Sequence, residues 1–308
     1  MSRMPPLVPE IALRMEEISK QISETLNING PFNIQFLVDE NLRLPETLVI
    51  EANLRASRSF PFVSKVMGEN FIKAATEVML GKEIPVQKHH DLKTYGIKVP
   101  HFSFTRLRQA DPVLRVEMAS TGEVACFGND IYEAYLKAVL STGISIPKKS
   151  ALLSLGGIEG KMRLLPTVKM LHDLGFSLYA TKNTADFLKF HGIPATFVYK
   201  VHENKTPNVV DVIRGKKVDL VVNLTDRSDL ALKHQVKEVT DGYLIRRAAV
   251  EVNIPLFTKT TIANVFVESL SRYYNMDKLK IKSWDEYVKK SKFKNQRSKL
   301  INILNIYE

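Results

Sequence analysis

The spacing of apolar and polar positions predicts a mixture of helices and strands in the first half of the chain. Ile11, Met15, Ile18 and Ile22 recur every three or four residues, which predicts an amphipathic helix over residues 9–27. The same reading predicts strands over 32–38, 47–52, 96–104 and 123–127, a turn at 39–41, and helices over 69–80 and 130–141. Asp130 is the expected N-cap of the last of these helices.

From about residue 143 onward, short apolar strands alternate regularly with amphipathic helices. Strands are predicted over 151–155, 176–180, 196–199, 218–222 and 255–257. Helices are predicted over 161–174, 184–190, 207–214, 241–251 and 261–272. Strands and helices that alternate at this spacing form a parallel sheet with helices on its faces. The predicted fold class is therefore α/β, a five-stranded parallel sheet preceded by a partial α+β region.

Composition narrows the class of protein. With 308 residues, 44% hydrophobic and 25% charged, the chain has the balance of a globular protein rather than a disordered or collagen-like one. No apolar run approaches the roughly 20 residues of a membrane span, so no membrane association is expected. The lone cysteine, Cys126, excludes an internal disulfide framework, and its apolar neighbours favour a packing role.

The net charge of +11 is unevenly distributed. Residues 272–308 hold ten Lys/Arg and four Asp/Glu, which is +6 of that total and predicts a solvated basic tail. A nucleic-acid interface would need a basic stripe with interleaved aromatic residues, and the sequence has neither. We therefore expect no nucleic-acid partner, and anionic small molecules as ligands of the remaining cationic groups.

One candidate site combines oxygen ligands with two arginines. Glu51 and Asn53 share a strand face because they are two residues apart, and Gln35 joins them if the neighbouring strands pair. Carboxylate and amide oxygens suit Mg²⁺ that bridges substrate phosphates. Arg55 and Arg58 follow directly and can hold phosphate oxygens, as phosphoryl transfer requires. The alternative is two strands with polar outward faces and solvated arginines.

A second candidate site lies where successive strands of the later region end. Ligands of open parallel sheets bind at the carboxyl ends of the strands. The residues expected there supply hydroxyls, an amide and two cations: Lys161, Thr181, Thr184, Lys200, Asn223 and Thr225. That set fits a phosphate or carboxylate ligand and lacks a nucleophile with a base beside it. The alternative is that Thr and Asn merely cap helices.

Two further pairs of residues are candidates for a site. His89 and His90 have no acidic or cysteine partners at ligand spacing, which favours a solvent loop. Arg246 and Arg247 lie within an apolar helix pattern, where they can reach an anion or, for one of the two, form a structural ion pair.

Long strings of the sequence resemble one enzyme family. EANLRASRSFPFVSK (51–65) and DPVLRVEMASTGEVACFG (111–128) resemble the end of the second ATP-grasp module of the carbamoyl-phosphate synthase large chain. GFSLYATKNTADFL, VDLVVNL and GYLIRRAAVEVNIPL resemble its regulatory domain, which has the methylglyoxal-synthase-like fold. The resemblance covers roughly residues 10–272. It implies a partial ATP-grasp module over 1–147, a methylglyoxal-synthase-like allosteric domain over 148–272 and a basic tail over 273–308.

The resemblance also implies roles for the candidate residues. In the family, residues matching Gln35, Glu51 and Asn53 ligate the Mg²⁺ or Mn²⁺ of ATP, and the one matching Arg55 contacts phosphate. That module phosphorylates carbamate to carbamoyl phosphate. The effector-binding residues of the regulatory domain match Lys161, Thr181, Thr184, Lys200 and Asn223.

Several parts of the family's large chain have no counterpart in this sequence. The chain is expected to be the tail of such an enzyme, as a fragment or the product of a truncated gene, and to make no carbamoyl phosphate by itself. The implied partners are the rest of the large chain and, for glutamine-dependent members, a glutaminase subunit or domain. The nitrogen donor and the compartment, cytoplasm or mitochondrial matrix, stay open.

The effector is either a nucleotide such as UMP, UTP or IMP, or N-acetyl-L-glutamate. Ammonia-dependent mitochondrial members carry Trp where this chain has Lys200, and a lysine favours a phosphate. Asp226 would repel either anion, and the balance favours a nucleotide. Two other functions compete: methylglyoxal synthase, whose Asp base and His partners are not found at the strand ends, and a stand-alone effector-binding module that regulates another polypeptide.

Overall fold

The computed structural model describes residues 9–39, 46–84, 94–104, 110–113, 120–224, 240–287 and 304–305. The chain divides into two compact units, Met1–Gly96 with Ile281–Leu304 and Ile97–Lys280 with Asn305–Glu308. Residues 97–147 thus group with the second unit by their contacts. The domain boundaries at 147/148 and 272/273 stay predictions that rest on the resemblance.

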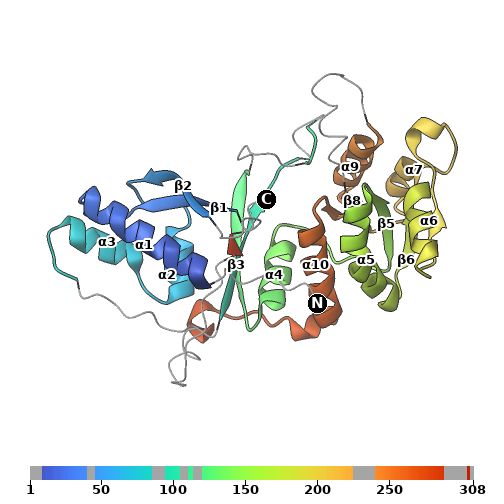
Figure 1. Cartoon of the computed structure of the whole chain (residues 1–308). Helices are drawn as coiled ribbons and strands as arrows, with labels where there is room; N and C mark the ends of the chain where they lie inside the picture. The colour runs from blue at the N-terminus through green and yellow to red at the C-terminus, as the bar shows by residue number, and fades with distance from the viewer. Residues whose placement is uncertain are drawn as a thin grey trace. The chain divides into compact units, whose positions relative to one another are not determined.

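The first unit is built on a two-stranded antiparallel sheet of β1 (Asn33–Asp39) and β2 (Glu46–Asn53). Its helices are α1 (Pro9–Thr25), α2 (Phe60–Met67) and α3 (Phe71–Met79). In Figure 1 these elements form the blue to cyan part, where the helices lie alongside the sheet. The predicted strands and the helices over 9–27 and 69–80 are confirmed, except that Asp39 ends β1 instead of starting a turn.

The sequence reading missed helix α2. Its signals are local and short: Ser59 occupies the N-cap, a proline lies in the first turn, and Gly68 ends the helix with φ of +69°. Phe62 and Val66, four residues apart, are buried. Eight residues give too few turns for apolar periodicity to predict a helix, so the sequence indicates α2 mainly through the residues at its two ends.

The second unit contains the predicted five-stranded parallel sheet, which is confirmed. Its spatial order is β7-β6-β5-β8-β9. The strands are β5 (Ser150–Leu155), β6 (Ser177–Ala180), β7 (Thr196–Phe197), β8 (Leu220–Leu224) and β9 (Leu256–Phe257). The helices are α5 (Ile158–Asp173), α6 (Lys182–Phe190), α7 (Val209–Arg214), α9 (Asp241–Glu251) and α10 (Thr260–Tyr273).

Helix α5 packs against α10, and α7 packs against α9 (Figure 1). The α7 and α9 side of the sheet is sealed by a buried apolar cluster that includes Leu152 and Val221 from the sheet and Val212 and Ile245 from the helices. Several boundaries differ from the prediction by one to three residues; for example, α5 begins at Ile158 and β8 begins at Leu220. The carboxyl end of β8 meets the start of α5, because the Gly156 N–H donates to the Leu224 carbonyl at 2.8 Å.

The remaining strands form a second, three-stranded sheet in the order β10-β3-β4. They are β3 (Tyr95–His101), β4 (Gly122–Gly128) and β10 (Leu304–Asn305). Helix α4 (Ile131–Ser141) packs on β4 and on α10. Its predicted N-cap is confirmed, because Asp130 Oδ1 accepts from the Glu133 N–H at 2.8 Å. The turn before α4 needs Gly128, because a Cβ there would lie 2.4 Å from the Ala134 nitrogen.

Candidate functional site

The first candidate site lies on one face of the β1–β2 sheet. Gln35 is paired with Glu51, and Asn33 with Asn53, across the antiparallel strands. Directly opposite residues, and residues two apart in a strand, project from the same face, so these four side chains share one face. The side-chain amide of Asn53 donates from Nδ2 to Glu51 Oε1 at 2.9 Å, which leaves its side-chain oxygen Oδ1 available to a cation. The register therefore brings together the three predicted ligands.

Asn33 was missed by the sequence reasoning, although its spacing from Gln35 is the same as that of Glu51 from Asn53. Only the observed pairing shows that it belongs to this face. A bulge follows immediately, since Phe36 pairs with Val49 and Ile50 is the extra residue of β2. The described residues contain no cluster of three His, Cys, Asp or Glu, so the donor set here is one carboxylate with amides. Such oxygen donors fit Mg²⁺ that keeps several waters.

Arg55 and Arg58 follow β2 and lie in the segment that leads to α2. The Arg55 N–H donates to the Asn53 carbonyl at 2.9 Å, which holds this turn against the end of the strand. Its guanidinium donates to the Ala56 carbonyl at 3.3 Å and is exposed, as is Arg58. The structure places both arginines next to the oxygen face along the chain, and their contact with phosphate stays a prediction.

The second candidate site lies at the carboxyl ends of β5, β6 and β8. Thr181 is the N-cap residue of α6, and Thr184 lies in the first turn of that helix. Thr184 is 1% exposed and its Oγ1 accepts from the Leu155 N–H at 3.1 Å, while Thr181 Oγ1 donates to it at 3.5 Å. These contacts tie the start of α6 to the end of the central strand β5. The Thr181 side chain makes no cap hydrogen bond, so the alternative that these threonines merely cap the helix is not what the structure shows.

Two lysines converge on the same edge. Lys161 Nζ donates to the Asn183 carbonyl, also in the first turn of α6, at 3.0 Å. Burial lowers the pKa of Lys161, and the nearby charge of Lys200 lowers it further, while Asp186 acts in the opposite direction. Lys200 lies at the start of the 3₁₀ helix η1 (Val201–Glu203). Two cations that repel each other at strand ends make an environment in which an anion is stabilising.

Asn223 is 3% exposed in β8, where it pairs with Ser154 of β5. Its Nδ2 donates to the Ser154 carbonyl at 3.4 Å, and its Oδ1 accepts from Arg246 Nη1 at 2.8 Å. Arg246 is itself paired with Asp111 through two contacts of 2.7 Å. The sixth predicted residue of this site, Thr225, lies outside the described residues, as do Asp226 and the pair His89 and His90.

Both members of the arginine pair form ion pairs, which confirms that reading for each of them. Arg247 pairs with Glu251 at 3.5 Å and donates to the carbonyls of Phe104 and Ala110. Cys126, for which a packing role was predicted, is half-buried. Its Sγ lies 3.5 Å from Ser141 Oγ, in keeping with packing rather than nucleophilic chemistry.

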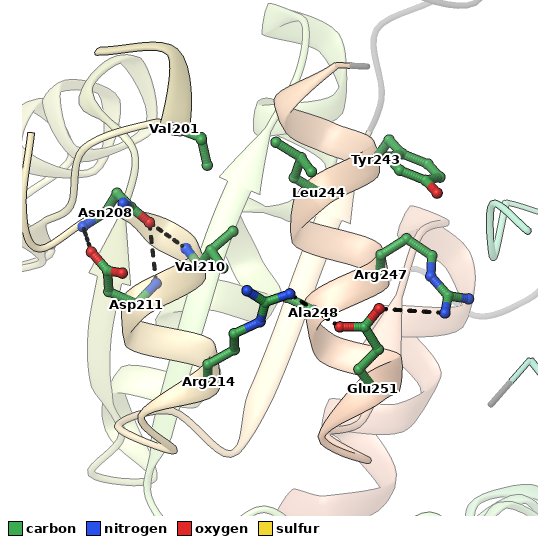
Figure 2. A pocket seen from close by; sticks show the side chains of 10 residues that line it. All are labelled: Val201, Asn208, Val210, Asp211, Arg214, Tyr243, Leu244, Arg247, Ala248 and Glu251. Atoms are coloured by element: carbon green, nitrogen blue, oxygen red, sulfur yellow. Dashed lines mark hydrogen bonds and ion pairs between the residues drawn. The ribbon is translucent and has the colours of Figure 1, made fainter. Parts of the chain in front are cut away.

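A separate groove of about 320 Å³ runs between α7 and α9. Figure 2 shows its lining, in which Glu251 lies between Arg214 and Arg247. Both guanidinium groups contact this one carboxylate, which offsets part of their charge within the groove. None of the residues predicted for the strand ends lines it, whereas Arg247 of the arginine pair does. The strand-end site, with two mutually repelling lysines, is the better candidate for an anionic ligand.

No helix among the described residues has both the length and the apolar content needed to traverse a membrane. Two family models match the chain. Residues 5–87 match "Carbamoyl-phosphate synthase L chain, ATP binding domain", and residues 163–258 match "MGS-like domain". The first match covers the oxygen face together with Arg55 and Arg58. The second match covers five of the six residues predicted for the strand ends, Thr225 among them. The sixth, Lys161, lies two residues before that match begins.

Curated relatives match most of the chain. The chain is 45% identical over 285 residues to the "Multifunctional protein pyrABCN" of Emericella nidulans, covering 89% of this chain and 12% of the relative. It is 42% identical over 279 residues to the "Multifunctional protein URA2" of Saccharomyces cerevisiae, covering 88% and 12%. It is 42% identical over 287 residues to "Carbamoyl-phosphate synthase [ammonia], mitochondrial" of Homo sapiens, covering 89% and 18%. The chain thus spans less than a fifth of the length of these relatives.

Proposed function

The chain is homologous to the carbamoyl-phosphate synthases, and on that premise we propose that it forms part of such an enzyme. In this proposal the β1–β2 face is part of the ATP and Mg²⁺ site that phosphorylates carbamate, and the strand-end site binds an effector. One observation carries the proposal: Lys161, Thr184 and Asn223 gather at the carboxyl edge of an MGS-like sheet, with a second cation at Lys200.

At the β1–β2 face, Gln35, Glu51 and Asn53 would hold Mg²⁺ or Mn²⁺ through their oxygens. The metal, when bound, supplies charge neutralisation to the phosphates of ATP. Arg55 and Arg58 contribute positive charge beside it, and a guanidinium can contact two phosphate oxygens at once. The transfer moves the terminal phosphoryl group of ATP to a carbamate oxygen, which yields ADP and carbamoyl phosphate.

At the strand-end site, the ligand is an anion that replaces the repulsion between Lys161 and Lys200 with attraction. A nucleotide such as UMP, UTP or IMP fits best, because a phosphate carries more negative charge than a carboxylate and Lys200 offers a point charge. N-acetyl-L-glutamate is the competing effector. The remainder of the synthase large chain, and a glutaminase subunit or domain in a glutamine-dependent enzyme, complete the proposed assembly, in the cytoplasm or the mitochondrial matrix.

Isothermal calorimetry on the 308-residue chain tests the effector site with UMP, UTP, IMP and N-acetyl-L-glutamate as separate probes. We expect a nucleotide to bind, and Lys161→Ala and Lys200→Ala each to weaken binding about 10-fold or more. Lys169→Ala is the matched control, because it removes one exposed lysine from the same helix as Lys161. Binding of N-acetyl-L-glutamate alone would overturn the choice of a nucleotide.

An activity assay tests the role of the chain within the synthase. The 308-residue chain with ATP, bicarbonate and ammonia is expected to make no carbamoyl phosphate, while a synthase that contains it is expected to lose that activity on Glu51→Ala. Synthesis by the chain alone, or full activity of the Glu51→Ala synthase, would contradict the proposed division of labour.

A further inference from the structure

Arg246 connects a predicted effector residue to an acidic residue far away in the sequence. Its side chain is completely buried on α9, at 0% exposure. One edge of the guanidinium pairs with Asp111, with Nε to Oδ1 and Nη2 to Oδ2 both at 2.7 Å. Its third nitrogen, Nη1, donates to Asn223 Oδ1 at 2.8 Å. A bidentate pair on one side thus fixes the direction in which the other side donates.

The chemistry of the arginine determines which way the Asn223 amide faces. A guanidinium has only donors, so the carbonyl end of Asn223 must point toward Arg246 and the NH₂ end must point away. Among the described residues, the Ser154 carbonyl receives one N–H hydrogen of that NH₂ group, at 3.4 Å. The second hydrogen is then the group with which Asn223 can meet a ligand.

We propose that Arg246 is a positioning residue of the effector site, held by Asp111, that turns the Asn223 amide so that Asn223 presents a hydrogen-bond donor. This inference rests on the proposed effector function. It specifies the ligand group opposite Asn223 as an acceptor, such as an oxygen of phosphate or carboxylate. A ligand with an ammonium group at that position, which can only donate, would face another donor.

Gly242 gives a way to disturb this contact without removing a charge. A Cβ at Gly242 would lie 2.9 Å from Arg246 Nη1 and 3.6 Å from Asn223 Oδ1. Nη1 is at the end of a flexible side chain, but the Arg246 side chain is restrained because it is fully buried and its guanidinium is hydrogen-bonded to Asp111. Gly242→Ala is therefore expected to push Nη1 away from Asn223, while alanine in the first turn of α9 suits a helix better than glycine.

Arg247 is the matched control. It is the next residue of the same helix, it is also buried, and it donates to the backbone carbonyls of Phe104 and Ala110. Arg247→Met therefore removes the same kind of buried guanidinium and is expected to lower thermal stability as Arg246→Met does. If the effect were a general loss of structure, the affinity for the ligand would fall equally in Arg246→Met and Arg247→Met.

Calorimetry on the 308-residue chain, with UMP and inorganic phosphate as probes, measures the effect on binding. We expect Arg246→Met and Gly242→Ala to weaken UMP about 10-fold, Arg246→Lys to recover part of the affinity, and Arg247→Met to stay within about 2-fold. In an Asn223→Ala background, Arg246→Met should have no further effect on affinity. Two results would overturn the proposal: an equal loss of UMP affinity in Arg246→Met and Arg247→Met, or the same loss of affinity on Arg246→Met in the Asn223→Ala background as in the wild-type background.

A measurement without ligand separates this inference from the proposed effector function. The side-chain amide resonances of Asn223 can be assigned in ¹⁵N spectra as the pair that disappears in Asn223→Asp. We expect that pair to shift and exchange faster in Arg246→Met and Gly242→Ala, and to stay in place in Arg247→Met. Unchanged resonances in Arg246→Met would refute positioning by Arg246, whereas failure of the wild-type chain to bind any probe would refute the effector site.

Discussion

The two candidate sites differ in how firmly their side chains are held. On the β1–β2 face, Glu51 and Gln35 are exposed, and the contact between the predicted ligands is the Asn53 to Glu51 hydrogen bond of 2.9 Å. At the strand-end site, Thr184 and Asn223 are almost completely buried and are tied to other elements of the same unit. The strand register aligns the first set, but packing and hydrogen bonds immobilise the second.

The difference between an exposed site and an organised one affects how tightly each can bind its ligand in this chain. Oxygen ligands on an open face leave a cation largely hydrated and bind it weakly until other groups exclude water. Buried hydroxyl and amide groups beside half-buried lysines are already organised for a ligand, which lowers the cost of binding. We therefore expect this chain to bind an effector measurably and Mg²⁺ only weakly.

The largest test of the comparison removes the packing behind the strand-end site. Phe266 in α10 is fully buried against Phe257, with ring centroids 4.4 Å apart. Phe266→Ala should lower the free energy of unfolding by about 3–5 kcal/mol, because it deletes a large buried side chain and leaves a cavity. Urea unfolding monitors this change, with Phe190→Ala, 85% exposed on α6, as the control. Equal small losses in both variants would mean that this core does not stabilise the unit.

A smaller loss is expected from a single hydroxyl of the site. Thr184→Val keeps the shape of the side chain but leaves the buried Leu155 N–H without the acceptor that it contacts at 3.1 Å. The expected cost is about 1–3 kcal/mol of unfolding free energy. Thr76→Val is the control, since Thr76 is on an exposed helix face and its hydroxyl bonds only its own helix, to the Ile72 carbonyl. A cost of less than a few tenths of a kcal/mol for Thr184→Val would argue that the site is not held by this contact.

The pH dependence of effector binding should follow Lys161. Its pKa is lowered by burial and by the charge of Lys200, so it loses its proton at a lower pH than an ordinary lysine. Affinity for UMP should consequently decline as the pH rises toward the ordinary lysine pKa, a range in which the phosphate itself no longer titrates. Calorimetry across this range measures the decline, and Lys161→Met should flatten it.

The same pKa shift predicts the opposite trend for the chain without ligand. Between the lowered folded-state pKa and the ordinary pKa of the unfolded chain, the unfolded chain binds more protons at this lysine than the folded chain, so the unfolding free energy rises with pH in that window. A parallel fall of affinity and stability would contradict the assignment of both effects to Lys161.

The smallest expected effect on stability concerns the open face. Glu51→Ala should change the unfolding free energy by no more than about 0.5 kcal/mol, because Glu51 is exposed and Asn53 can turn its N–H to water. Thermal unfolding of the purified chain measures it. A loss comparable to that of Thr184→Val would show that the two sites are held equally firmly, which removes the contrast between them.

Periodicity predicted the α/β class and all five strands of the parallel sheet, because the pattern of a buried strand or an amphipathic helix is contained in its own residues. It also placed Gln35, Glu51 and Asn53 on one face, because the period of a strand is fixed. Asn33 escaped notice because membership of that face depends on which residue lies opposite. Asp111 was missed as the partner of Arg246 for a similar reason, since 135 residues separate them and no local pattern links them.

The bulge at Ile50 has a consequence for how this sequence can change over evolutionary time. Side chains of a strand alternate between its two faces, so an inserted or deleted residue exchanges the faces of everything beyond it. The bulge already uses one such step, directly before Glu51. Because Val49 and Ile50 are exposed, amino-acid replacements there are expected to be tolerated, whereas a one-residue gain or loss within β2 between Thr47 and Glu51 would turn the carboxylate to the opposite side of the ribbon. Length, more than chemical identity, is the constrained property of this stretch.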